Sequence, residues 1–302
     1  MKTIYIRILM PLLMLASSSA LAQQAFTYTQ YMNNLTAYNP AYSLLNEAGS
    51  INALGRKQWV GINGAPSSFV FAGALPLEAI RGSVGLVAMH DQFAIEKLTE
   101  VSAFYAKSIQ LSYDTYLAAS FNAGFRNYNA SYSQLDAFDP KFNNDIRENT
   151  GTIGASILYY NPDRFYVGAS LPRLSMRSLG KASIEDARYN KNTWYFSGAY
   201  LFDLDDSFKL KTASLLSYTR TLPSLFDIST TLYIKNRIGI GAGYRSTNEA
   251  SGLLSYFFDN NVMVGYSYQT GFGAVKVGGA SNGTHEITFG FRFGDFKKQS
   301  LL

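Results

Sequence analysis

Apolar and polar side chains alternate along most of this chain, from about residue 50 to its C-terminal end. In the last apolar stretch, one set of alternate positions holds Ile287, Phe289, Phe291 and Phe293, and the other holds Glu286, Thr288, Gly290 and Arg292. A period of two predicts β-strands, because successive side chains leave opposite faces of the pleat. In a soluble β-sandwich the apolar face would form the core. In an outer-membrane barrel that face meets lipid, and the small or polar face lines the lumen.

The first 22 residues have the features of a cleavable export signal. Lys2 and Arg7 form a short basic region, residues 8–16 are apolar, and residues 20–22 form a small-x-small cleavage site. The mature chain should therefore begin near Gln23. This apolar run is shorter than the roughly 20 residues that a spanning helix needs, and no later run is long enough. A membrane form of the mature chain would therefore be a closed barrel, since only helices and closed barrels satisfy every backbone polar group in lipid.

Fourteen segments with the alternating pattern follow residue 49. They lie near 50–60, 67–76, 81–90, 98–108, 114–128, 150–160, 164–172, 192–202, 207–217, 225–235, 237–246, 250–258, 262–270 and 284–293. Every second connection is short and rich in turn-forming residues, and the longest loops, 130–150, 172–191 and 270–283, fall between those turns. Tight turns on one rim, long loops on the other and an even strand number are typical of bacterial outer-membrane barrels.

The sequence therefore predicts an all-β protein, a transmembrane antiparallel β-barrel of about 14 strands over residues 50–293. The signal peptide of residues 1–22 precedes it, and residues 23–49 form an N-terminal segment in the periplasm or the lumen. Residues 294–302 form a C-terminal periplasmic tail, and both termini lie on the periplasmic side of the outer membrane. A barrel of this size lies between small packed barrels and wide porins, so its interior is either a modest pore or a filled lumen.

Composition agrees with this class and excludes others. The chain is 15% aromatic and only 16% charged, which suits a lipid-facing belt with aromatic girdles. It has no Cys, so it has no disulfide framework and no thiolate metal site. The formal net charge of +5 falls to 5 − 2 = +3 once Lys2 and Arg7 leave with the signal peptide. That charge is too small and too scattered to indicate nucleic-acid binding.

Candidate chemistry is sparse, and we expect no enzyme and no cofactor. The two histidines are His90 and His285, and His285 lies beside Glu286 at the start of a strand, without further ligands at metal-site spacing. A lipase-type Ser-His-acid triad stays the third functional alternative, because triads follow geometry rather than spacing. The acidic residues of the loop 130–150 are most simply a solvated rim. A divalent-cation site there is a minority hypothesis that involves Asp136, Asp139 and Asp145.

Short motifs in a fixed order stand out near both ends of the mature chain. They are Gln30-Tyr31, Asn39-Pro40-Ala41-Tyr42, Arg56-Lys57-Gln58-Trp59, Gly64-Ala65-Pro66 and Gly283-Thr284-His285-Glu286-Ile287. Together they resemble the PorP/SprF family of outer-membrane proteins, which is found with the type IX secretion and gliding machinery of Bacteroidetes. The resemblance covers the full mature length. It implies a non-enzymatic barrel that works through partners, which are periplasmic secretion components, a large secreted adhesin, or both. Nothing in the motifs selects between these roles.

The first motifs also suggest a physical hypothesis. Gly64 and Pro66 suit a shaped first hairpin, and Trp59 suits an interfacial anchor. If Trp59 meets lipid, Arg56 and Gln58 point into the lumen, where they would hold the N-terminal segment near Asn39 and Tyr42 as an internal latch. The simpler alternative is that each residue stabilises its own turn or strand.

The functional runner-up to the secretion role is an outer-membrane transporter or porin-like channel for small or hydrophobic solutes.

Overall fold

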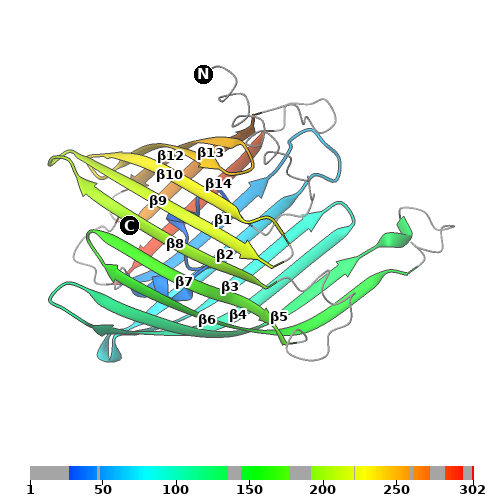
Figure 1. Cartoon of the computed structure of the whole chain (residues 1–302), viewed down its shortest axis with the longest axis horizontal. Helices are drawn as coiled ribbons and strands as arrows, with labels where there is room; N and C mark the ends of the chain where they lie inside the picture. The colour runs from blue at the N-terminus through cyan, green and yellow to red at the C-terminus, as the bar shows by residue number, and fades with distance from the viewer. Residues whose placement is uncertain are drawn as a thin grey trace, which may run out of the picture.

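The computed structural model describes residues 27–45, 48–134, 144–176, 192–220, 222–258, 261–272, 283–294 and 301–302. Fourteen antiparallel strands form one closed barrel, in which each strand pairs with its sequence neighbours and β1 pairs with β14 (Figure 1). The strands are β1 (Gly49–Lys57), β2 (Ser67–Leu77), β3 (Gly82–Phe93), β4 (Glu96–Gln110), β5 (Tyr116–Ala130), β6 (Ile146–Asn161), β7 (Phe165–Ser175), β8 (Thr193–Asp203), β9 (Phe208–Thr219), β10 (Leu225–Ile234), β11 (Ile238–Arg245), β12 (Glu249–Phe258), β13 (Val262–Gly271) and β14 (Thr284–Phe293). The prediction of a 14-stranded antiparallel barrel is confirmed.

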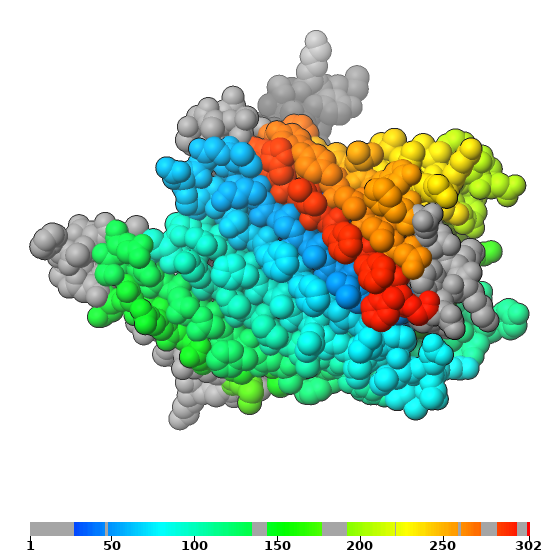
Figure 2. Space-filling model, turned by 180° about the vertical axis from the view of Figure 1, so that it is seen from behind, coloured from blue at the N-terminus to red at the C-terminus, as the bar shows by residue number. Residues whose placement is uncertain are grey.

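The barrel closes through a continuous antiparallel seam between β1 and β14. The register runs from Gly49 opposite Phe293 to Lys57 opposite His285. Figure 2 shows this seam from behind, with the red strand β14 running between blue β1 and orange β13. Closure leaves neither terminal strand with an unpaired edge, which a lipid environment would not tolerate.

The alternation in the sequence separates the two faces of the wall. In β14, Glu286 and Thr288 point inward and are 1% and 0% exposed, whereas Ile287 and Phe289 point outward and are 61% and 42% exposed. Large apolar side chains cover the outer face of most strands in the same way. The apolar face is therefore the lipid-facing one, as the barrel interpretation predicts.

The two rims differ in their connections. β1 begins and β14 ends at one rim, here called the terminal rim, which also carries short turns such as 162–164 and 235–237. The other rim, here called the loop rim, carries the long connections 131–145 and 176–192. It also has tight turns, because Ala94 and Ile95 alone separate β3 from β4. The loop rim is thus less uniform than the sequence pattern predicts.

The core of the molecule lies inside the barrel, where residues 27–45 form what we call the lumen segment. Every residue of this segment is buried except Asn33, which is partly buried. It contains two 3₁₀ turns, η1 (Tyr31–Asn33) and η2 (Pro40–Leu44). No helix in the described ranges is long and apolar enough to cross a membrane. The predicted signal peptide, residues 1–22, lies outside the described residues.

Candidate functional site

The Asn-Pro-Ala-Tyr motif builds the turn that docks the lumen segment on the wall. Asn39 caps η2, because its Oδ1 accepts a hydrogen bond of 3.1 Å from the Ala41 amide, and Pro40 takes the first helical position. The Asn39 Nδ2 donates to the Ile157 carbonyl of β6 at 3.0 Å. Gly168 of β7 makes room for this contact, because a Cβ there would lie 2.7 Å from the Asn39 Nδ2. One asparagine therefore caps the turn and binds the wall.

Tyr42, the last residue of the motif, points toward the terminal rim. Its ring packs edge-on against Tyr166 of β7, with the centroids 5.4 Å apart. Its hydroxyl donates a hydrogen bond of 2.5 Å to the main-chain oxygen of Leu302. Burial raises the pKa of Tyr42 to about 12, so the phenol keeps its proton and remains a donor. Tyr42 therefore connects the lumen segment to the end of the chain.

Arg56 and Glu286 form a buried ion pair across the β1–β14 seam. The two residues are directly opposite in the register, and Arg56 Nη1 lies 3.3 Å from Glu286 Oε1. The side chains are 3% and 0% exposed. Two motifs at opposite ends of the sequence thus meet in the lumen, at the strand pair that closes the barrel.

This ion pair also binds the start of the lumen segment. Glu286 accepts hydrogen bonds from the Thr29 amide at 2.7 and 2.9 Å and from the Gln30 amide at 3.0 Å. Arg56 donates to the Thr27 carbonyl through Nη1 and to Gln269 Oε1 of β13, at 3.2 Å, through Nη2. A buried ion pair is stable only where further hydrogen bonds satisfy both charges, and here the lumen segment provides most of them.

The lumen segment is held by contacts that differ from those named in the latch hypothesis. Arg56 does point into the lumen, but there it holds Thr27. Asn39 binds β6 through the Ile157 carbonyl, and Tyr42 packs against Tyr166 of β7. Gln58 lies beyond the end of β1, and its backbone N–H donates to the Pro66 carbonyl at 2.9 Å.

Trp59 does not continue the strand, so the predicted strand near 50–60 ends earlier. Its φ of +46° turns the backbone away from the strand direction, and the last residue of β1 is Lys57. The face alternation inferred for Trp59 therefore does not apply. The indole instead packs edge-on against Phe93, with the ring centroids 6.5 Å apart.

The residues Gly64, Ala65 and Pro66 join the first loop to its neighbours. Gly64 has a φ of +73°, which favours glycine, and its carbonyl accepts a hydrogen bond of 2.9 Å from the Ala94 amide. Ala65 is buried, and Pro66 accepts the bond from Gln58 just before β2 begins. These contacts give the three residues a role in shaping the loop rim.

The histidines lie apart from the buried ion pair. His285 is on the outer side of β14, where its Nδ1 lies 2.7 Å from the Tyr266 hydroxyl, and His90 Nδ1 lies 2.8 Å from Thr99 Oγ1. Glu286 pairs with Arg56 rather than with its neighbour His285. Within the described ranges, no group of three or more His, Cys, Asp or Glu residues is placed to hold a metal ion. Asp136 and Asp139 of the cation hypothesis lie outside those ranges.

Comparison with known proteins assigns the family. A family model described as "Type IX secretion system membrane protein PorP/SprF" matches residues 20–291. The chain belongs to the PorP/SprF family. The matched range contains the motifs near both ends, including Asn39, Arg56 and Glu286. A search of curated proteins finds no match. The barrel and the family together indicate the outer membrane, and both are non-enzymatic in kind.

Several solved barrels resemble this PorP/SprF protein at low identity. The outer-membrane protein Omp33 of Acinetobacter baumannii is 11% identical, with a TM-score of 0.48 over 82% of this chain and 99% of that chain. The toluene transporter TodX of P. putida is 9% identical, with a TM-score of 0.45 over 89% of this chain and 95% of that chain. The KdgM porin is 11% identical, with a TM-score of 0.38 over 81% and 99%.

A second buried ion cluster in this PorP/SprF protein escaped the sequence analysis. Glu100 of β4 lies 2.9 Å from Arg126 Nε of β5 and 4.0 Å from Arg173 Nε of β7. Arg173 also donates to the Ala37 carbonyl of the lumen segment at 3.3 Å and to the Tyr195 hydroxyl at 3.0 Å. The register of β6 and β7 shifts near Gly154, and at this irregularity both Pro172 and Arg173 become buried. Alternation alone does not predict such a shift.

A third cluster lies on β10 to β12. Arg245 Nε donates to Asp227 Oδ1 at 2.7 Å, and its Nη1 lies 3.8 Å from Glu249 Oε2. Gln269 of β13 connects this cluster to the lumen segment, since it contacts both Glu249 and Thr29. The available signal was a charged residue at an inward position of a strand. The partner of each charge came from another strand and was not visible in the sequence.

Proposed function

We propose that this PorP/SprF protein supports the secretion or surface attachment of large adhesin-like proteins by binding protein partners. The partners we propose are periplasmic components of the type IX secretion apparatus, a secreted adhesin, or both. In this proposal the terminal rim faces the periplasm and the loop rim faces outward. The protein acts as a specific outer-membrane platform for these partners rather than as a solute pore.

The observation that carries this proposal is the filled lumen. The lumen segment is bound at its start by Glu286 and Arg56 and further along by Ile157, the partner of Asn39. Two cavities beside it measure about 50 and 10 Å³, room for a few water molecules. A lumen packed with hydrogen-bonded backbone favours a partner-binding role over bulk diffusion of solutes. Family membership supports the same direction, because the family is named for a secretion system.

The test is affinity purification of the tagged protein from its native outer membrane, with mass spectrometry of the proteins that accompany it. We expect type IX secretion components or one large secreted adhesin, and we expect that adhesin to be lost from the surface of a deletion strain. Recovery of a barrel without partners, combined with steady solute conductance in planar bilayers, would overturn the proposal in favour of a channel.

A further inference from the structure

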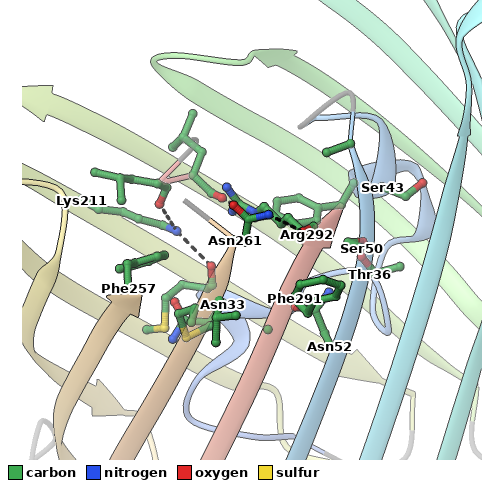
Figure 3. Close-up of a pocket in the computed structure, with 18 of the residues that line it drawn as sticks. Asn33, Thr36, Ser43, Ser50, Asn52, Lys211, Phe257, Asn261, Phe291 and Arg292 are labelled. Carbon is green, nitrogen blue, oxygen red and sulfur yellow. Dashed lines mark hydrogen bonds between the residues drawn. The ribbon is translucent and has the colours of Figure 1, made fainter. Parts of the chain in front are cut away.

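A pocket at the terminal rim lies between the lumen segment and strands β1, β9, β13 and β14 (Figure 3). Among its described lining residues are two cations, Lys211 of β9 and Arg292 of β14, and no acidic side chain. Figure 3 shows Lys211 reaching into the pocket, with its two hydrogen bonds dashed. A pocket that offers cationic donors and no acidic side chain suits a ligand that brings hydrogen-bond acceptors.

The chain itself provides such a ligand. Leu301 and Leu302 belong to no strand, yet they are only 4% and 2% exposed, inside this pocket. The Leu301 main-chain oxygen accepts from Lys211 Nζ at 2.7 Å, and that of Leu302 accepts from the Tyr42 hydroxyl at 2.5 Å. The dipeptide thus buries two aliphatic side chains and satisfies two backbone acceptors.

The surroundings of Lys211 are those of a peptide-recognition group. Its side chain is buried, and no ion pair among the described residues includes it. Its ammonium donates to two main-chain carbonyls, Met32 at 2.9 Å and Leu301 at 2.7 Å. Burying a cation is costly unless hydrogen-bond acceptors surround it. Loss of the tail would remove the Leu301 oxygen, one of the two carbonyls to which the Lys211 ammonium donates.

The tail and the lumen segment are held by different kinds of contact. Charged and amide side chains of several strands bind the lumen segment, among them Glu286, Arg173 and Gln269. The contacts of Leu301 and Leu302 include hydrogen bonds to their two main-chain oxygens, and a cavity of about 50 Å³ remains beside them. A short peptide held in this way at a rim is suited to exchange with another.

We propose that this pocket is a peptide-binding site whose resident ligand is Leu301–Leu302 of the same chain. The tail exchanges with a second peptide that carries two adjacent aliphatic side chains and free backbone carbonyls. Lys211 and Tyr42 are the recognition residues. The site is separate from the proposed secretion role, because its test uses only the purified barrel and succeeds or fails without any secretion component.

The first experiment measures binding of a fluorescent peptide, FKKQSLL, which copies residues 296–302, to the purified barrel in detergent. A barrel that lacks Leu301 and Leu302 should bind the peptide saturably, and the intact barrel should bind it at least ten-fold more weakly because its own tail competes. A peptide with Ser-Ser in place of Leu-Leu should not bind. Equal binding of the two peptides, or no binding to the shortened barrel, would overturn the proposal.

Two variants separate recognition from folding. In the shortened barrel, Lys211→Met and Tyr42→Phe should each weaken peptide binding at least five-fold, whereas Lys209→Met should leave it unchanged. Lys209 is a matched control, because it lies two positions away on β9 and pairs with Asp203 outside the pocket lining. Heat-modifiable electrophoretic mobility shows that each variant is a folded barrel. Unchanged binding in both folded pocket variants would refute their role.

The second experiment reports on the tail of the full-length chain. Since the natural chain has no Cys, Leu302→Cys introduces a single thiol. The thiol should react slowly with a bulky maleimide and at least five-fold faster when FKKQSLL is added in excess, because the peptide displaces the tail. A labelling rate that stays slow when the peptide is added would contradict an exchangeable resident ligand.

Discussion

Arg56 Nη1 lies 3.3 Å from Glu286 Oε1, and this contact joins the first strand of the barrel to the last. The same two side chains bind the backbone of residues 27–30. One buried ion pair therefore connects the closing strand pair of the wall to the start of the lumen segment.

Removing one partner of this pair should loosen the lumen segment. Arg56→Ala leaves the Glu286 carboxylate buried and unpaired, which typically costs about 3–5 kcal/mol. We expect a lower temperature for loss of the heat-modifiable band and faster protease cleavage near residue 27. Lys97→Ala, at an exposed position on β4, is the control. If the Arg56→Ala barrel is as heat-stable and protease-resistant as the wild type, the ion pair stabilises neither the barrel nor the lumen segment.

The cap and the wall contact of Asn39 can be separated. Asn39→Ser keeps an oxygen that can cap η2 but removes the Nδ2 donor to Ile157, whereas Asn39→Ala removes both. The lost cap should cost about 1 kcal/mol, and the lost hydrogen bond to the wall about 0.5–1.5 kcal/mol. Protease resistance of the lumen segment should fall in the order wild type, Asn39→Ser, Asn39→Ala. Equal resistance of the Ser and Ala variants would assign the whole effect to the wall contact.

A methyl group at Gly168 should displace Asn39 from the wall. The new Cβ would lie 2.7 Å from Asn39 Nδ2 and 2.8 Å from the Ile157 oxygen, closer than normal contacts. We expect Gly168→Ala to destabilise the barrel by about 1–3 kcal/mol, as overpacking does. Gly55→Ala is the matched control, because nothing lies within 4 Å of a Cβ at that strand position. Urea-dependent loss of tryptophan fluorescence compares the two, and equal midpoints would mean that the wall adapts.

Glu100 should be harder to replace than an exposed acid. Glu100→Gln leaves the guanidinium groups of Arg126 and Arg173 without their carboxylate, in a buried place. We expect a loss of about 3–5 kcal/mol in stability, measured by urea denaturation in lipid vesicles. Glu78→Gln, at an exposed position on the terminal rim, should change stability by less than about 0.5 kcal/mol. Similar losses in the two variants would contradict a structural role for the Glu100 cluster.

Deleting the lumen segment should turn the barrel into a conductor. Wild-type protein in planar bilayers should pass little current, and a chain that lacks residues 23–45 should show stable channels. The 14-stranded wall has its own hydrogen-bonded closure, so the shortened chain retains the seam between β1 and β14. Heat-modifiable mobility checks that it folds. High conductance of the wild type would show that residues 27–45 do not obstruct the lumen.

The strand pattern could be predicted from the sequence because side-chain direction in a strand depends only on neighbouring positions. Ile287 and Phe289 face lipid and Glu286 and Thr288 face inward, as their alternation indicates. The end of β1 could not be predicted in this way, because the turn at Trp59 depends on a φ of +46° and on packing against Phe93. The register shift near Gly154 was equally invisible, since a bulge changes the period without leaving a composition signal.

The motifs identified the family, but they did not indicate which residues meet. Arg56 and Glu286 were both noted from the sequence, yet only closure of the barrel places them opposite each other. Lys211, Leu301 and Leu302 carried no signal, because their contacts join strand β9, the lumen segment and the end of the chain. Local periodicity determined the strands, their faces and the class of fold. The tertiary structure alone decided how the lumen is filled, because burial and charge pairing depend on contacts between distant residues.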